Sequence, residues 1–360
     1  MEDRKNLLQR GVELLPGLVV LLAIGLCGKY LERGFASLLN ESSKVLAKDM
    51  YILFAIIVGM IVGNLVNFPR IFRQGIATYE FFLKFGVVLI GAKLAIQELF
   101  KLGGIGIILV ILEIMASILI VRVVARKFKL SEKLSSLISI GVGICGVSAI
   151  VGCAPAIDAD EKDSSYAIAI ILIFGAMALI LYPAIGKLLD MSDKSFGIWA
   201  GLAVDNTAEA VATGHIYSET AGKYATMTKL MRNALMGITI LGFAVYYANR
   251  GMARGISHKG RFIWEKFPKF VIGFVLFSIF ASIRFENGYV FLTGAHVKAF
   301  SNLYKWAFML TFAGVGLSTS LKDMRGTGFK PFVVGITTEL GVGIFTLILI
   351  YALGFTGILL

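Results

Sequence analysis

Charged residues are scarce in this sequence: they make up 16% of its 360 residues, whereas about 25% is usual for soluble domains. Hydrophobic residues make up 57%. Charge-free runs near the roughly 20 residues that a bilayer crossing needs occur at 50–69, 134–157, 164–186 and 340–360. We therefore expect an all-helical, polytopic membrane protein rather than a soluble enzyme, a secreted scaffold or a β-barrel, in which polar and apolar residues would alternate.

Cysteine and histidine are also rare, with three residues of each type. Cys27, Cys145 and Cys153 lie in apolar stretches, where an odd number fits neither a disulfide framework nor a cysteine-based metal site. The histidines have no ligand spacing, so we expect no metal and no cofactor other than a coupling Na⁺ or proton. The net charge of +12 comes from Lys and Arg in short loops, which argues against a nucleic-acid partner.

Hydropathy predicts nine spanning helices and two further apolar segments rich in small residues. Lys and Arg are more numerous in the loops on the side of the N-terminus. The positive-inside rule therefore places the N-terminus in the cytoplasm and the C-terminus outside. The two small-residue segments cover 134–156 and 195–214, and the nine spans are expected at 12–28, 50–68, 79–97, 102–121, 164–188, 226–248, 268–284, 299–320 and 331–358.

Two weak internal matches indicate a repeat. Residues 81–94 (FFLKFGVVLIGAKL) align with 308–321 (FMLTFAGVGLSTSL), and 141–154 aligns with 201–214. Inverted repeats are common in secondary transporters. We therefore predict a single transmembrane domain, 1–360, built as an inverted repeat of two halves, 1–158 and 159–360.

Both small-residue segments are expected to break in the middle. Glycine costs roughly 1 kcal/mol relative to alanine in a helix, so the four glycines between 141 and 152 favour unwinding around 144–147. Ser148 is then expected to cap a half-helix that starts at Ala149. In the second segment, the break is expected at Val204 and Asp205, with Asn206 as the cap of the next half-helix.

Two half-helix N-termini that meet inside the membrane would attract an anion. The alternative for the glycines is close helix packing, which we expect for Gly59 and Gly63. Acidic residues inside a membrane usually serve ions or substrates. The predicted substrate-binding residues are Gly143, Cys145, Gly146, Val147, Ser148, Asn206 and Thr207, and the predicted ion-coupling residues are Asp205, Glu209, Glu113 and Glu339.

Other charges in apolar segments suggest structural roles. Lys84 or Lys93 could pair with Glu113. Lys229 and Arg232 are expected to anchor their helix at the membrane interface, and contact with the carboxylates of the second broken segment is the alternative.

Several stretches resemble the YeiH family, whose members carry the description of sulfate exporters. They are LPGL at 15–18, GN at 63–64, KFGVVLIG at 84–91, GICGVSAI at 143–150, YAIAIILIFG at 166–175 and FGIWAG at 196–201. The resemblance implies a bacterial inner-membrane protein, similar to the clan of cation:proton antiporters and bile-acid symporters, in which a core domain moves against a scaffold. The chain departs from that family at 204–209, where relatives tend to have His-Asp-Thr-x-Gln and this chain has an added carboxylate, Glu209.

These features predict a secondary active transporter, not an enzyme, that moves a small anion such as sulfate or another sulfur oxyanion by an elevator-like movement. The alternatives are a cation:proton antiporter that uses Asp205 and Glu209, and a passive anion channel. Membrane lipid surrounds the protein in each case, and a homodimer is the expected assembly of a transporter with a mobile core.

Overall fold

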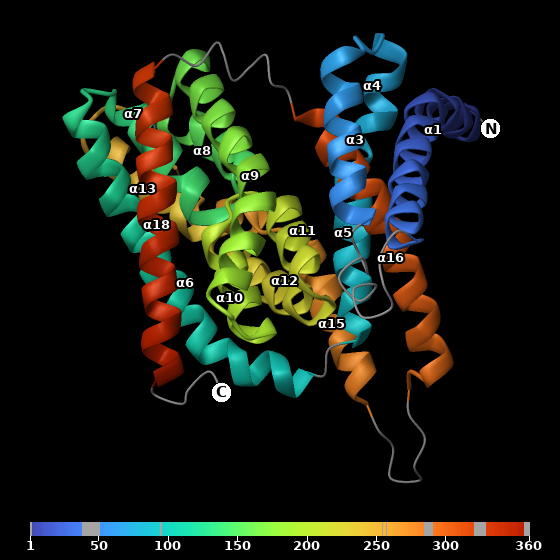
Figure 1. Cartoon of the computed structure of the whole chain (residues 1–360). Coiled ribbons are helices and arrows are strands. Elements are labelled where there is room, and N and C mark those ends of the chain that lie inside the picture. The colour runs from blue at the N-terminus through green and yellow to red at the C-terminus, as the bar shows by residue number, and fades with distance from the viewer. Residues whose placement is uncertain are drawn as a thin grey trace. The chain divides into compact units, whose positions relative to one another are not determined.

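The computed structural model describes residues 2–37, 51–93, 96–253, 255–256, 258–283, 291–319 and 329–355, and every regular element in these ranges is helical (Figure 1). The predicted all-helical membrane fold is thus confirmed. Five helices in these ranges are long and apolar enough to cross a membrane: Glu13–Phe35, Gly103–Lys127, Glu161–Leu188, Glu219–Asn249 and Phe332–Gly354. They match the expected spans 12–28, 102–121, 164–188, 226–248 and 331–358.

The other expected spans coincide with helices of more varied length. The segments 50–68 and 268–284 fall on the short apolar helices Tyr51–Leu65 and Phe270–Ser282. The segments 79–97 and 299–320 fall on α5 (Tyr79–Ile90) and α16 (Gly294–Ser318).

The chain divides into two compact units, each formed from two separate stretches of sequence: 1–96 with 272–321, and 97–271 with 322–360.

The first unit is held together by close approach of helix backbones. It contains α1 (Glu2–Ser37), α3 (Tyr51–Leu65), α4 (Arg70–Ala77), α5, most of α15 (Phe270–Ser282) and α16. A Cβ at Gly59 would lie 2.7 Å from the carbonyl oxygen of Ala313, and one at Gly63 would overlap the carbonyl of Leu317. The predicted packing role of Gly59 and Gly63 is therefore confirmed, because only a residue without a side chain allows this contact between α3 and α16.

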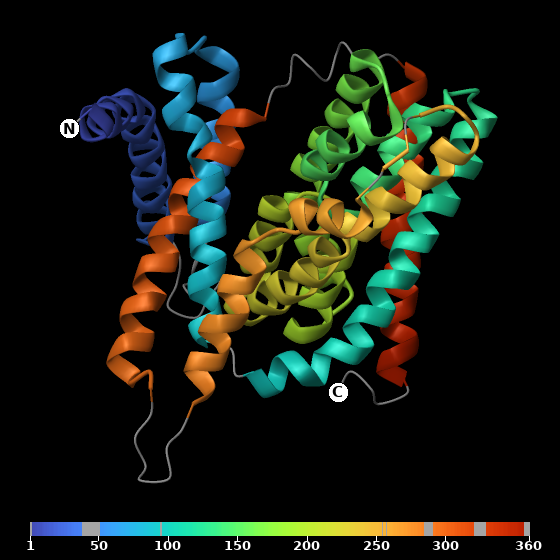
Figure 2. The ribbon, with the colours of Figure 1, turned by 180° about the vertical axis from the view of Figure 1, so that it is seen from behind.

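The second unit holds both broken segments. The helices of this unit are α6 (Ile96–Lys127), α7 (Glu132–Ile140), α8 (Val147–Cys153), α9 (Glu161–Leu188), α10 (Asp193–Ala203), α11 (Thr207–Tyr217), α12 (Glu219–Ala234), α13 (Met236–Asn249), α14 (Lys259–Lys266) and α18 (Phe329–Phe355). Ile120 of α6 packs on Gly341 of α18, and Figure 2 shows these two helices side by side. Helix α12 packs against both α10 and α11, while α9 packs against α7, α11 and α18.

The first broken segment unwinds through a π-helical turn, Gly141–Cys145, that follows α7 directly. Gly146 then has φ +68°, and α8 begins at Val147. The predicted position of the break is confirmed, but the predicted cap is wrong. Gly146, not Ser148, is the N-cap residue, because a glycine reaches this backbone conformation without strain and the chain turns two residues earlier than expected. Ser148 lies in the first turn of α8.

The second broken segment interrupts its helix as predicted. Helix α10 ends at Ala203, the backbone of Val204 is extended, and α11 begins at Thr207. Asn206 is the N-cap, since its side-chain oxygen accepts a hydrogen bond from the backbone N–H of Ala208 at 3.0 Å. The break thus leaves the ends of two half-helices facing inward without regular backbone partners.

Candidate functional site

The two breaks meet inside the second unit. A Cβ at Gly146 would lie 3.3 Å from the Cα atom of Asn206 and 2.9 Å from the side chain of Ile171. The backbones of the two segments therefore approach so closely that only glycine fits at position 146. We refer to residues 141–147 and 203–207, together with the side chains that bind them, as the crossover.

Arg232 of α12 joins the two breaks. Its side chain is completely buried. The Nε–H donates to the carbonyl of Gly143 at 3.2 Å, and Nη1 donates to the carbonyl of Leu202 at 2.5 Å. Nη2 donates to the carbonyl of Val142, and further bonds run to Gly201 and Val204. The guanidinium group therefore satisfies carbonyl groups that both helix breaks leave without intrahelical donors.

Lys229, one turn earlier on α12, binds the second break. Its Nζ donates to the carbonyl of Val204 at 2.8 Å and to that of Asp205 at 2.5 Å, and the side chain is fully buried. Cations are favoured at helix C-termini, where the carbonyl ends of the dipoles gather. The expectation that Lys229 and Arg232 anchor the helix at the interface is therefore wrong, because the broken helices supply unpaired carbonyls that only buried donors can reach.

Glu113 of α6 completes this arrangement. One of its oxygens lies 3.3 Å from Nε of Arg232, and both side chains are fully buried. The predicted pairing of Glu113 with Lys84 is wrong: Lys84 forms an exposed pair with Glu80, 3.6 Å away and one turn earlier on α5. The side chain of Lys93 lies outside the described residues. Glu113 is drawn to Arg232 because a buried charge needs a charged partner.

Three more carboxyl groups gather at the crossover from different elements: Asp205 between α10 and α11, Glu209 in α11 and Glu339 in α18. Their exposed fractions are 1%, 2% and 7%. Within the part of the chain that the structure describes, both oxygens of Asp205 and one oxygen of each glutamate receive no hydrogen bond from a nitrogen or hydroxyl donor. The carboxyl groups of Asp205 and Glu339 lie close enough to influence each other electrostatically.

Glu209 owes its position to a glycine on the neighbouring helix. A Cβ at Gly175 of α9 would overlap the carboxyl group of Glu209. Gly175 thus leaves the space that the carboxyl group occupies. The arrangement presents buried acceptor oxygens that lack donors, and a proton or a cation is the species that would satisfy them.

The predicted substrate-binding residues lie in the crossover, except Ser148, which follows it directly in α8, and they differ in accessibility. Cys145 is buried with its Sγ 3.5 Å from Sδ of Met236. Thr207 is buried and accepts a hydrogen bond from the side chain of Asn233 at 3.1 Å. The carbonyl of Gly143 accepts a hydrogen bond from Arg232. Val147 and Asn206 are half-buried and Ser148 is exposed.

Sequence reasoning gave no site role to Asn233 or Gly175, and for Lys229 and Arg232 it kept a contact with the carboxylates only as the alternative to interface anchoring. The signal for these two cations was available: two cations three residues apart lie on one face of a helix, and their segment follows an acidic helix break. The signal for Gly175 was absent, because its role depends on which helix α11 packs against.

A membrane unit in which two interrupted helices meet around buried charges defines a class of integral membrane proteins with discontinuous helices. The family model described as "Conserved hypothetical protein 698" matches residues 16–335. The chain therefore belongs to this family. No solved structure matches the chain.

Curated relatives carry the description "UPF0324 membrane protein". One from Nitratidesulfovibrio vulgaris is 30% identical over 339 residues, which cover 93% of this chain and 92% of that protein. Another, SAG1125 of Streptococcus agalactiae, is 32% identical over 308 residues, which cover 84% of this chain and 89% of that protein. A relative from Clostridium tetani is 30% identical over 314 residues, with coverage of 84% and 89%. These descriptions support a membrane protein, and they name neither transport nor sulfate.

Proposed function

We propose that this protein is a secondary active transporter, with the crossover as its ion-coupling and substrate site. The observation that carries the proposal is the difference between the cations and the acids there. Arg232 and Lys229 are bound to backbone carbonyls, whereas Asp205, Glu209 and Glu339 keep oxygens without donors. Such a cluster favours a coupling proton or Na⁺, because intramembrane carboxylates are costly and usually mark ion pathways.

Interrupted helices favour transport over a catalytic role. In transporters, discontinuous helices create ion sites without exposing irregular backbone to lipid, because the broken ends line a cavity or bind side chains.

The proposal includes the nine spans, the inverted repeat and an elevator-like movement of the unit that holds the crossover. It also includes the bacterial inner membrane, a cytoplasmic N-terminus, an outer C-terminus and a homodimer. The repeat is supported by one feature, since the two aligned small-residue segments both break.

A small anion is the proposed cargo, with sulfate or another sulfur oxyanion as the first candidate. Asn206 and Ser148, at the beginnings of α11 and α8, are the predicted binding residues with accessible polar side chains. The positive end of the α11 dipole also favours an anion at Asn206. A cation:proton antiporter is the second candidate, favoured by the same unpaired oxygens of Asp205 and Glu209, which would then bind the cargo itself.

Flux into proteoliposomes and ligand-dependent melting together test the proposal. Purified protein would be melted with sulfate, sulfite, thiosulfate, carboxylates or chloride, each as the Na⁺ or choline salt, and counterflow of the stabilising ion would then be measured. A ligand that binds only the folded state raises the melting temperature in a saturable way. The variants are Ser148→Ala and Glu209→Gln, and Glu265→Gln is the control because Glu265 is 56% exposed and pairs with Arg261.

Stabilisation by one anion, lost in Ser148→Ala, together with saturable counterflow, would support anion transport. A flat anion panel with a Na⁺ or pH response that Glu209→Gln abolishes would select the antiporter. Flux without saturation or counterflow would contradict secondary transport and indicate a channel. Responses that are equal in wild type, Ser148→Ala and Glu209→Gln would contradict the assigned site.

A further inference from the structure

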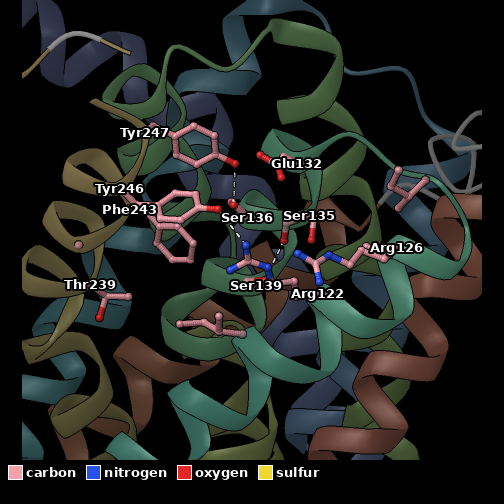
Figure 3. A pocket seen from close by; sticks show the side chains of 14 residues that line it. Arg122, Arg126, Glu132, Ser135, Ser136, Ser139, Thr239, Phe243, Tyr246 and Tyr247 are labelled. Atoms are coloured by element: carbon pink, nitrogen blue, oxygen red, sulfur yellow. Dashed lines mark hydrogen bonds between the residues drawn. The ribbon is translucent and has the colours of Figure 1, made fainter. Parts of the chain in front are cut away.

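A second polar site lies in the same unit, between α6, α7 and α13. It is a cavity of about 360 Å³. Figure 3 shows the side chains of Arg122 and Arg126 pointing into it from α6, near the hydroxyl groups of Ser135 and Ser136 on α7. We refer to this cavity as the basic pocket. Its size falls in the range of sites for small organic ligands.

The positive charge of the basic pocket is only partly compensated. Arg122 donates one hydrogen bond, at 2.8 Å, to the hydroxyl group of Tyr246, and its guanidinium carbon lies 5.5 Å from the centre of that ring. Glu132 also lines the pocket, but it binds Arg250 at 3.2 Å. Arg126 has no carboxylate partner among the described residues. Two guanidinium groups therefore remain with N–H groups that can bind an oxyanion.

The pocket is amphipathic. Ile118 and Phe243 line it together with the arginines and serines. On α6, Ile118 lies one turn before Arg122, and Arg126 lies one turn after it. The polar part is thus at the end of the apolar span Gly103–Lys127, where a membrane helix meets the headgroup layer. A ligand that fits has an anionic head beside the arginines and an apolar part that extends toward the membrane interior.

We propose that the basic pocket binds a phosphate group that carries an apolar chain, as found in an anionic phospholipid. A bare oxyanion would contact the arginines and serines but leave Ile118 and Phe243 without a partner. A lipid with an anionic phosphate headgroup satisfies both parts, and basic pockets between membrane helices are a recurrent form of lipid recognition. This inference is independent of the proposed transport activity, because the pocket shares no lining residue with the acids of the crossover.

Melting of the full-length protein in detergent tests this assignment. The probes are short-chain phosphatidylglycerol, short-chain phosphatidylcholine and inorganic phosphate, each titrated separately. The variants are Arg126→Gln and Arg122→Gln/Arg126→Gln. Lys127→Gln is the matched control, because it removes a charge from the same helix end but Lys127 does not line the pocket.

We expect saturable stabilisation by phosphatidylglycerol and a loss of apparent affinity of about tenfold or more in Arg126→Gln, as for one lost charge-assisted hydrogen bond. Lys127→Gln should respond like wild type. Equal affinity for inorganic phosphate would overturn the lipid assignment, because the apolar chain would then add nothing, and it would indicate a free anion at the arginines. No response to any probe, or the same response in wild type and the double variant, would overturn the proposal. Arg126→Gln keeps the test valid if the double variant does not fold.

Discussion

The crossover and the basic pocket lie in the same unit, and each contains two cationic side chains. The groups left without a partner differ, however: they are carboxyl groups in the crossover and guanidinium groups in the basic pocket. In the crossover, Arg232 and Lys229 donate their hydrogen bonds to backbone carbonyls, and carboxyl oxygens remain without donors. In the basic pocket, the carboxylate Glu132 is bound by Arg250, and guanidinium groups remain. The ligand of a polar site therefore follows from the groups left unsatisfied, not from the number of charges of either sign.

The largest effect is expected from Arg232→Met. The substitution leaves Glu113 and the carbonyls of both breaks without their donor, and removal of one partner of a buried ion pair costs about 3–5 kcal/mol. We expect a large fall in melting temperature or loss of folded protein. Melting of the purified variant, and its yield where it cannot be purified, are the measurements.

Two comparisons make this result specific. Arg232→Lys keeps the charge but reaches fewer carbonyls, so its stability should lie between those of wild type and Arg232→Met. Arg261→Gln removes a 78% exposed arginine from the same unit and should leave stability unchanged. A melting temperature of Arg232→Met equal to that of wild type would contradict the role of Arg232 in joining the breaks.

A smaller effect is expected from Gly146→Ala. The residue has φ +68°, and a Cβ would press on Ile171 and approach Asn206. Holding a residue with a side chain in such a conformation costs about 1–3 kcal/mol. Gly242→Ala in α13 is the control, because a Cβ there meets nothing within 4 Å. Equal melting temperatures for the two variants would mean that the breaks do not approach as closely as described.

The positions of the breaks could be predicted from sequence, because they depend on local chemistry. The glycines at 141–146 and the capping side chain of Asn206 act within a few residues of themselves. The partners of the breaks could not be predicted this way. Glu113 pairs with a residue 119 positions away, and nothing near it in sequence distinguishes Arg232 from Lys84 as its partner.

The error at Lys229 and Arg232 has a physical cause. Cations at a helix end usually bind the membrane interface, and that rule holds when the neighbouring helices are continuous. Here the neighbours are interrupted, so carbonyl groups deep in the unit need donors. The acids Asp205, Glu209 and Glu339 were found from sequence because a carboxylate in an apolar segment is unusual whatever its partners are.

A change in the opposite direction is expected from Glu339→Gln. The side-chain amide can donate a hydrogen bond to the carboxyl group of Asp205, which receives none from a nitrogen or hydroxyl among the described residues. We expect a gain of about 1 kcal/mol in the free energy of unfolding and loss of the Na⁺ or proton response. Glu265→Gln serves again as the exposed control. Destabilisation of Glu339→Gln would show that the carboxylate itself supports the fold.

The smallest effect on stability is expected from Arg126→Gln, because Arg126 is exposed and surface substitutions usually change stability by less than about 0.5 kcal/mol. Its effect should instead appear in the salt dependence of ligand binding. At about 0.5 M salt, charges near the surface are screened over a few ångströms, whereas buried pairs are screened much less. Stabilisation of wild type by phosphatidylglycerol should therefore fall as NaCl is raised, and it should fall less steeply in Arg126→Gln, which has one fewer charge to screen. The melting temperature of the ligand-free protein, held by the buried crossover, should change little over the same range. A ligand response that is independent of salt in both proteins would mean that the apolar part of the basic pocket alone holds the lipid.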